Sequence, residues 1–176
     1  MMSAHIFVDE TKERGLLVAA AVVLTRDLAP ARKVMRSLIL PNQRRIHFHK
    51  ERDDRRRQIV GAINGIGAQA VILDASDHPN MKAARDASLV RLVAYAAKIG
   101  AVRLVIEQDD STIKADRRLL FDEVQKAGLS ETVRYDHLRA HEECLLAIPD
   151  ALAWCWAKRG RWRAAVQRTV VESYRL

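Results

Sequence analysis

One stretch decides the fold: residues 5–25 read HIFVDETKERGLLVAAAVVLT. His5–Asp9 is a mostly apolar run that ends in an acid, and Gly15–Thr25 is rich in Val, Leu and Ala, so both segments are expected to be strands, the second well buried. The polar residues between them end in Gly15, which favours a turn. We therefore expect the chain to begin with an antiparallel hairpin.

After the hairpin the pattern is helical before it returns to strands. A helical insertion is expected at about residues 27–66, with its signals at Asp27 (cap), Pro41 (stop), Arg45–His49 (an extended piece) and Asp53 or Asp54 (start of the next helix). Later strands are expected at 70–73, 102–107 and 132–138, helices at 83–99 and 114–127, and a helical segment, kinked or restarted at Pro149, at 142–159. Strands separated by helices pair in parallel, so the order predicts an α/β fold with a mixed five-stranded sheet and flanking helices.

Length and charge narrow the class of protein. A chain of 176 residues fits one domain, 1–176. Its 30 Lys and Arg outnumber 22 Asp and Glu, and the net charge of +8 favours a polyanionic partner such as nucleic acid. Basic residues gather near the end of the chain, where Arg159, Arg161 and Arg163 are candidates for nucleic-acid binding. The alternative is an ordinary solvated basic surface.

The sequence also bears on location. The longest apolar run, Leu16–Leu24, is too short to span a bilayer, and the first ten residues lack the pattern of a signal peptide, so no membrane association is expected. Cys144 and Cys155 lack metal-type spacing and are interpreted as buried thiols in a reducing cytoplasm. The number of subunits is left open, and a homodimer is one of the assemblies that the sequence allows.

Three acids stand where a metal site would be built. Asp9 and Glu107 each end an apolar strand, and strand ends converge on one rim of a sheet. Asp150 lies in an apolar helical stretch, where an aspartate needs a metal, a hydrogen-bond network or a cap. A turn is the alternative for Asp9. Glu10 follows Asp9 and points to the opposite face unless the strand twists.

Other charged groups have weaker claims. Asp109 and Asp110 are interpreted as helix caps, and the mixed charges around Asp53 and Asp54 as a solvated helix face. His47, His49 and Lys50 are candidates for phosphate contact, because two histidines spaced by two on an extended segment share a face. The sequence contains no nucleophile elbow, Walker loop, dinucleotide fingerprint, zinc-protease motif or calcium loop.

With these residues the chain resembles the domain of unknown function 3800 family of the ribonuclease H-like superfamily. The matching stretches are Val8-Asp9-Glu10, the apolar run Leu16–Val23, Ile46-His47-Phe48, and Ile148–Trp154. Two departures are Thr11-Lys12 in place of Ser-Gly after the acidic pair and Pro149 in place of a small residue. The resemblance implies a ribonuclease H-like fold and a metal site of Asp9, Glu107 and Asp150, with Glu10 as a fourth member.

The resulting hypothesis is a nuclease dependent on Mg²⁺ or Mn²⁺. Asp9, Glu107 and Asp150 would hold the ions, and Glu10 or His47 would orient water or phosphate. One alternative is a nucleic-acid- or protein-binding module that keeps the fold without catalysis. Another is an enzyme for a small phosphorylated molecule, which would keep its activity when the chain is cut after Arg159.

Overall fold

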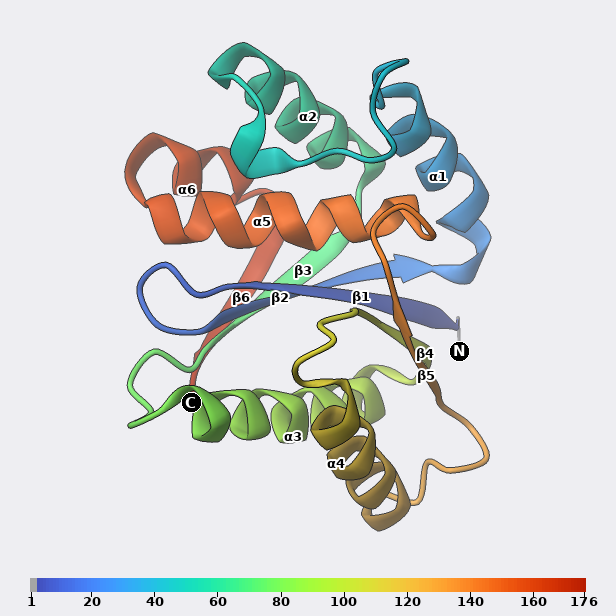
Figure 1. Ribbon diagram of the computed structural model, residues 1–176. Helices are drawn as coiled ribbons and strands as arrows, with labels where there is room; N and C mark the ends of the chain where they lie inside the picture. The colour runs from blue at the N-terminus through green and yellow to red at the C-terminus, as the bar shows by residue number, and fades with distance from the viewer. Residues whose placement is uncertain (1–2) are drawn as a thin grey trace.

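The computed structural model describes residues 3–176 as one central sheet between two layers of helices (Figure 1). The chain begins with the expected hairpin, in which β1 (Ala4–Thr11) pairs antiparallel with β2 (Leu17–Leu24), and Val8 lies opposite Ala20. Gly15 in the connection has a φ of +85°, and a Cβ there would lie 2.7 Å from that of Ser76. The turn therefore requires a glycine at this position.

Four further strands complete the sheet in the order β5-β4-β1-β2-β3-β6. They are β3 (Gln69–Asp74), β4 (Ala101–Glu107), β5 (Arg134–Leu138) and β6 (Val170–Arg175). Strand β2 is antiparallel to both of its neighbours, whereas β1–β4, β4–β5 and β3–β6 pair in parallel. The mixed sheet that opens with an antiparallel hairpin is confirmed.

The predicted number of strands was too low by one. The sheet has six strands because residues 170–175 pair with β3 at the far edge. The sequence analysis assigned no strand to residues 160–176 and considered their basic side chains only as a surface for a polyanion. Cutting the chain after Arg159 would therefore remove an edge strand and the helix before it, so such a truncation is unsuitable as a test of activity.

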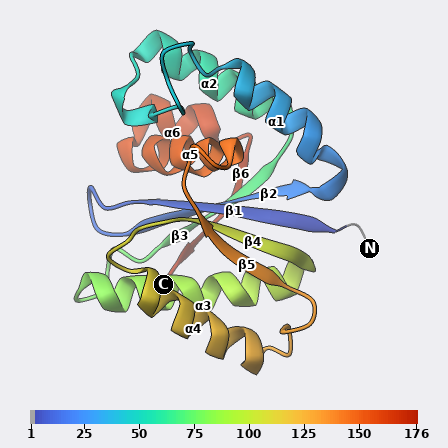
Figure 2. The ribbon, with the colours of Figure 1, turned by 45° about the vertical axis from the view of Figure 1, so that its right-hand side comes forward.

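The helices divide between the two faces of the sheet (Figures 1 and 2). One face carries α1 (Leu28–Ser37), α2 (Asp53–Ile66), α5 (Ala147–Lys158) and α6 (Gly160–Val166). The other carries α3 (Met81–Ile99) and α4 (Ile113–Lys126). Alternating strand residues feed two separate cores: Phe7 and Val105 pack under α5, and Ile6, Val8 and Ile106 pack toward α3 and α4. None of the helices in residues 3–176 combines the length and apolarity that crossing a membrane requires.

The insertion between β2 and β3 differs from prediction in one detail. The expected extended piece ends at His47, and Phe48–Lys50 forms a short 3₁₀ turn. The guanidinium of Arg56 holds this turn, donating to the carbonyls of Phe48 at 3.1 Å and His49 at 2.6 Å. It also lies 4.3 Å from the centre of the Trp154 ring. The turn is therefore anchored to α5.

The last predicted helical segment, 142–159, begins later than expected and ends close to its predicted end, and the helix α6 that follows was not predicted. Cys144–Leu146 forms a 3₁₀ turn that leads into α5, with Pro149 in the first helical turn, where its missing N–H costs little. The break between α5 and α6 lies at Arg159, which has a φ of +61°. Few residues other than glycine adopt that backbone conformation.

Candidate metal centre

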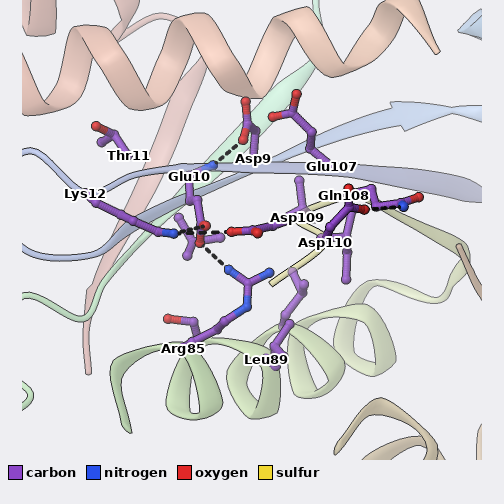
Figure 3. Close-up of a pocket in the computed structure, with 15 residues that line it drawn as sticks. Asp9, Glu10, Thr11, Lys12, Arg85, Leu89, Glu107, Gln108, Asp109 and Asp110 are labelled. Atoms are coloured by element: carbon purple, nitrogen blue, oxygen red, sulfur yellow. Dashed lines mark hydrogen bonds and ion pairs between the residues drawn. The ribbon is translucent and has the colours of Figure 1, made fainter. Parts of the chain in front are cut away.

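The register of the sheet brings Asp9 and Glu107 together. Strands β1 and β4 are parallel neighbours, with Phe7 paired to Val105 and Val8 to Ile106, so the next residue of each strand lies beside the other. Phe7 and Val105 face α5, and side chains alternate along a strand, so Asp9 and Glu107 also face α5. Figure 3 shows both carboxylates pointing to that side of the sheet.

Helix α5 supplies a third carboxylate close to these two. Asp150 lies in the first turn of α5, which packs across β1 and β2, and the backbone N–H of Phe48 donates to its Oδ2 at 3.4 Å. Burial and the charge of Glu107 raise the pKa of Asp150 to about 6, against the opposing effects of the Phe48 hydrogen bond and the charge of Arg45. This carboxylate is thus held in a place that disfavours its charge.

Asp9 is the most perturbed acid of the group. Burial, a hydrogen bond with the Glu107 carboxyl group and the negative charges of Asp150 and Glu107 raise the pKa of Asp9 well above its usual range. The backbone N–H of Glu10 donates to Asp9 Oδ1 at 2.7 Å and opposes the shift. Groups with such strongly shifted pKa values collect at functional sites, which makes this cluster the leading candidate.

The three carboxylates do not form a complete metal-coordination site in this structure. Within residues 3–176, no three His, Cys, Asp or Glu side chains lie close enough together to hold one metal ion as they stand. Asp9 and Glu107 lie on adjacent strands, and Asp150 acts on Asp9 through its charge. Their donors are carboxylate oxygens, which hard divalent cations prefer, so the chemistry of the group fits such an ion.

Glu10 does not join this cluster. It points to the opposite face of the sheet, toward α3, where Arg85 Nη1 donates to Glu10 Oε2 at 2.6 Å and the Lys12 ammonium lies 3.4 Å from Oε1 (Figure 3). The strand does not twist enough to bring Glu10 to the side of Asp9. The expectation that it serves as a fourth member of the site therefore lacks geometric support, for the reason that strand alternation gives.

Sequence reasoning missed a buried charged network behind Glu10. Arg85 donates to both carboxylate oxygens of Asp116, each at 2.7 Å, and His137 Nε2 lies 3.1 Å from Asp116 Oδ2. Burial opposes the effect, yet the hydrogen bonds from Arg85 and His137 lower the pKa of Asp116 to about 2. The side chains of Asp116 and His137 are only 2% and 1% exposed. A helical spacing was available as a signal, because Arg85 shares a face of α3 with Leu89 and Leu92.

A pocket of about 660 Å³ opens on this second face, beneath the ends of β1 and β4. Leu89 and Leu92 of α3 form part of its apolar wall, and Glu10, Lys12 and Arg85 contribute polar groups. Asp9 and Glu107 also line it, so the pocket reaches the strand ends that carry the cluster, although both carboxylates point to the α5 face. Its volume is in the usual range for small-molecule sites, roughly 300–1,000 Å³.

The residues predicted to contact phosphate between α1 and α2 differ in their exposure. His47 is half-buried and near the cluster: burial and the charges of Arg45 and Lys50 lower its pKa, and the charge of Glu107 opposes them. His49 and Lys50 are exposed. The centres of the two imidazole rings are 6.4 Å apart at an angle of 76°, because the 3₁₀ turn begins between them.

The predicted basic residues after α5 have different environments. Arg159 and Arg161 are exposed, and Arg161 Nη2 lies 3.3 Å from Asp53 Oδ2. Arg163 is partly buried and donates twice to the carbonyl of Trp156, at 2.9 and 2.7 Å. Its guanidinium therefore satisfies the end of α5, which leaves Arg159 and Arg161 as the accessible pair.

Comparison with known proteins supports the fold. No protein-family model matches the chain, and no curated protein matches it. One similar solved structure is that of the PCNA:RNase HII complex from Archaeoglobus fulgidus, with a TM-score of 0.59 and 16% sequence identity. The match covers 95% of this chain and 77% of the other. The chain therefore has a mixed α/β fold like that of the structure it matches.

Proposed function

We propose that this protein is a nuclease dependent on Mg²⁺ or Mn²⁺, related to the domain of unknown function 3800 family, with Asp9, Glu107 and Asp150 as its metal ligands. The ribonuclease H-like fold supports a nuclease in general terms. A fold alone does not fix an activity, so the proposal depends on the carboxylates.

One observation carries the proposal: these three acids have no cationic partner. Among residues 3–176, no salt bridge includes Asp9, Glu107 or Asp150, although the chain is rich in arginine. Burial, together with the negative charges of neighbouring acids, raises the pKa values of Asp9 and Asp150. Buried carboxylates gathered without a salt-bridge partner are costly for folding alone, so a bound cation is the simplest reason for their arrangement.

The residues in and beside the cluster would have different roles in such a site. A pair of divalent ions can activate the attacking water and stabilise the leaving oxygen during phosphodiester hydrolysis. Asp9, Glu107 and Asp150 would hold these ions through their carboxylate oxygens. The backbone N–H of Glu10 fixes the rotamer of Asp9 through its 2.7 Å hydrogen bond. His47 beside the cluster would orient a phosphate oxygen or a water.

The basic residues around the cluster support a nucleic-acid substrate. His49 and Lys50 are exposed on the loop that carries His47, and Arg159 and Arg161 are exposed at the end of α5. Phosphate contacts of this kind add affinity that falls as the salt concentration rises. With a net charge of +8, the chain is suited to a polyanion.

Substitution of the ligands tests the proposal. Asp9→Asn and Asp150→Asn are expected to lower Mn²⁺-dependent cleavage of labelled DNA or RNA by at least about 100-fold, since electrostatic stabilisation dominates this chemistry. Asp122→Asn is the matched control, because Asp122 is an exposed acid of α4 outside both the cluster and the pocket, and this variant should retain the rate. Undiminished metal-dependent cleavage by highly purified Asp9→Asn would refute the assignment.

A second candidate is a nucleic-acid-binding module without catalysis. It is favoured by the observation that no three metal-ligating side chains in residues 3–176 are grouped closely enough for an ion. This module would bind nucleic acid in a salt-sensitive way, with the same affinity in Mn²⁺ and in chelator, and Asp9→Asn would leave that affinity unchanged. Cleavage by the wild-type protein would exclude it.

A further inference from the structure

The pocket under β1 and β4 has no task in the chemistry proposed above, although it touches the same strand ends. Its apolar wall comes from four elements: Leu89 and Leu92 of α3, Val18 of β2, Val8 of β1 and Ile106 of β4. Asp9 and Glu107 stand at the rim that it shares with the candidate metal centre. Whatever binds in this pocket therefore lies next to the proposed site of phosphodiester cleavage.

Most of the ionised side chains in the pocket are paired with an opposite charge. Apart from Asp9 and Glu107 at the rim, each ionised side chain at its edge lies within 4 Å of an opposite charge: Glu10 with Arg85 (2.6 Å), Lys12 with Asp109 (3.4 Å) and Asp110 with Arg139 (3.0 Å). A phosphate inside would meet three carboxylates, and a free ammonium group would compete with Arg85 and Lys12. A neutral group fits this balance better than either ion does.

The polar rim and the apolar wall together suit a flat, hydrogen-bonding group. Donors and acceptors converge from Glu10, Lys12, Arg85 and Gln108. Arg85 is fixed in the wall because two of its nitrogens are bound to Asp116, so its planar guanidinium is presented rigidly. An aliphatic surface beside a planar cation is a surface on which an aromatic ring packs well.

From these observations, and resting on the proposed function, we propose that the pocket receives one unstacked nucleobase of the nucleic acid whose phosphate lies at Asp9 and Glu107. A nucleobase is neutral, planar and carries both donors and acceptors on its edge. An enzyme that takes one base out of the stack gains selectivity for single strands, ends or distorted sites, where unstacking costs least. The substrate class of the site is then unpaired nucleic acid rather than continuous duplex.

Filling the pocket tests this inference. Leu89→Phe and Val18→Phe place a ring in the pocket from two different walls. Binding is measured by fluorescence anisotropy with a labelled twelve-nucleotide RNA and its DNA counterpart, and with versions that carry one abasic nucleotide at each position in turn. The measurements are made in chelator, so they do not depend on cleavage. Val90→Phe is the matched control, because Val90 is exposed on the same helix and lies outside the pocket.

We expect one abasic position to weaken binding to the wild-type protein by about tenfold, as the loss of one packed base would. Each pocket-filling variant should bind the intact strand about tenfold more weakly and should no longer distinguish the abasic strand, whereas Val90→Phe should match wild type. A 2-aminopurine at the sensitive position should brighten on binding, because it leaves the stack. Thermal unfolding by circular dichroism confirms that each variant is folded.

Two outcomes would overturn the inference: equal affinity of the wild-type protein for every abasic strand, or equal weakening of intact and abasic strands by folded Leu89→Phe and Val18→Phe. The proposed nuclease activity can fail separately. If the abasic pattern appears but Mn²⁺ elicits no cleavage, the base pocket stands and the nuclease assignment falls. If cleavage occurs and no position is sensitive, the assignment stands and the pocket falls.

Discussion

Two neighbouring acids on β1 have opposite surroundings. Asp9 faces α5, where its nearest charged neighbours are the carboxylates of Glu107 and Asp150. Glu10 faces α3, where Arg85 lies 2.6 Å and Lys12 lies 3.4 Å from its oxygens. The two residues are one peptide bond apart and have nearly the same chemistry. The difference between them comes entirely from strand alternation and from what each face of the sheet presents.

This contrast separates a structural use of buried charge from a candidate functional one. On the α3 face every acid of the network has a cationic partner, so the network can hold α3, α4, β1 and β5 together without any ligand. On the α5 face the acids have each other, which weakens the fold unless a cation binds. The following experiments measure the two faces against each other, from the largest expected effect to the smallest.

Removal of the Arg85 guanidinium should destabilise the protein, because the charged network on the α3 face depends on it. Arg85→Met leaves Asp116, whose side chain is 2% exposed, with a buried charge that has lost its main partner. Breaking a buried ion pair from one side costs roughly 3–5 kcal/mol, so the free energy of unfolding in urea should fall by about that amount. Arg118→Met, on the exposed side of α4, is the control and should change it by less than about 0.5 kcal/mol. A loss for Arg85→Met as small as that of the control would show that the network adds nothing to stability.

The sequence predicted the α5 face of this comparison better than the α3 face. Asp9 and Glu107 each end an apolar strand, so their adjacency could be expected as soon as the strands were assigned to one sheet. Asp150 was conspicuous because it interrupts an apolar helix. These signals are local, and the ribonuclease H-like resemblance gave them an order along the chain.

The network was not predicted because its partners are remote in sequence. Arg85 lies 75 residues from Glu10 and 31 from Asp116, and its place on the apolar face of α3 indicates burial without naming a partner. Strand β6 was missed for a related reason. It is an edge strand with exposed Val171, Glu172 and Ser173, so it lacks the apolar run that identified the central strands. Its pairing with β3 depends on tertiary contacts alone.

A metal ion bound to the acids on the α5 face should stabilise the protein. At a Mn²⁺ concentration 100 times the dissociation constant, binding to the folded state alone adds about 2.7 kcal/mol to the free energy of unfolding. Wild-type protein should therefore melt at a higher temperature in Mn²⁺ than in chelator, as measured by differential scanning calorimetry. Glu107→Gln should lose most of this gain and Glu10→Gln should keep it. An identical gain in both variants would place the ion elsewhere.

The two faces should also respond to pH with opposite signs. In chelator, the pKa of Asp150 is raised to about 6, so its protonated form is favoured by folding. That contribution is fully present below the ordinary aspartate pKa near 4 and is lost as the pH rises through about 6. The pKa of Asp116 is lowered to about 2, so its contribution is present above pH 4 and is lost as the pH falls through about 2.

Each limb of the stability profile can be assigned by one substitution. A shift of nearly two pKa units corresponds to about 2 kcal/mol for Asp116, so urea unfolding should show a decline of that order toward low pH. Asp150→Asn should flatten the decline between about pH 4 and pH 6 and leave the acid limb, because the Arg85 network is intact. If Asp150→Asn instead altered the acid limb, the two faces would be coupled through β1, and the separation of a paired face from an unpaired one would no longer hold.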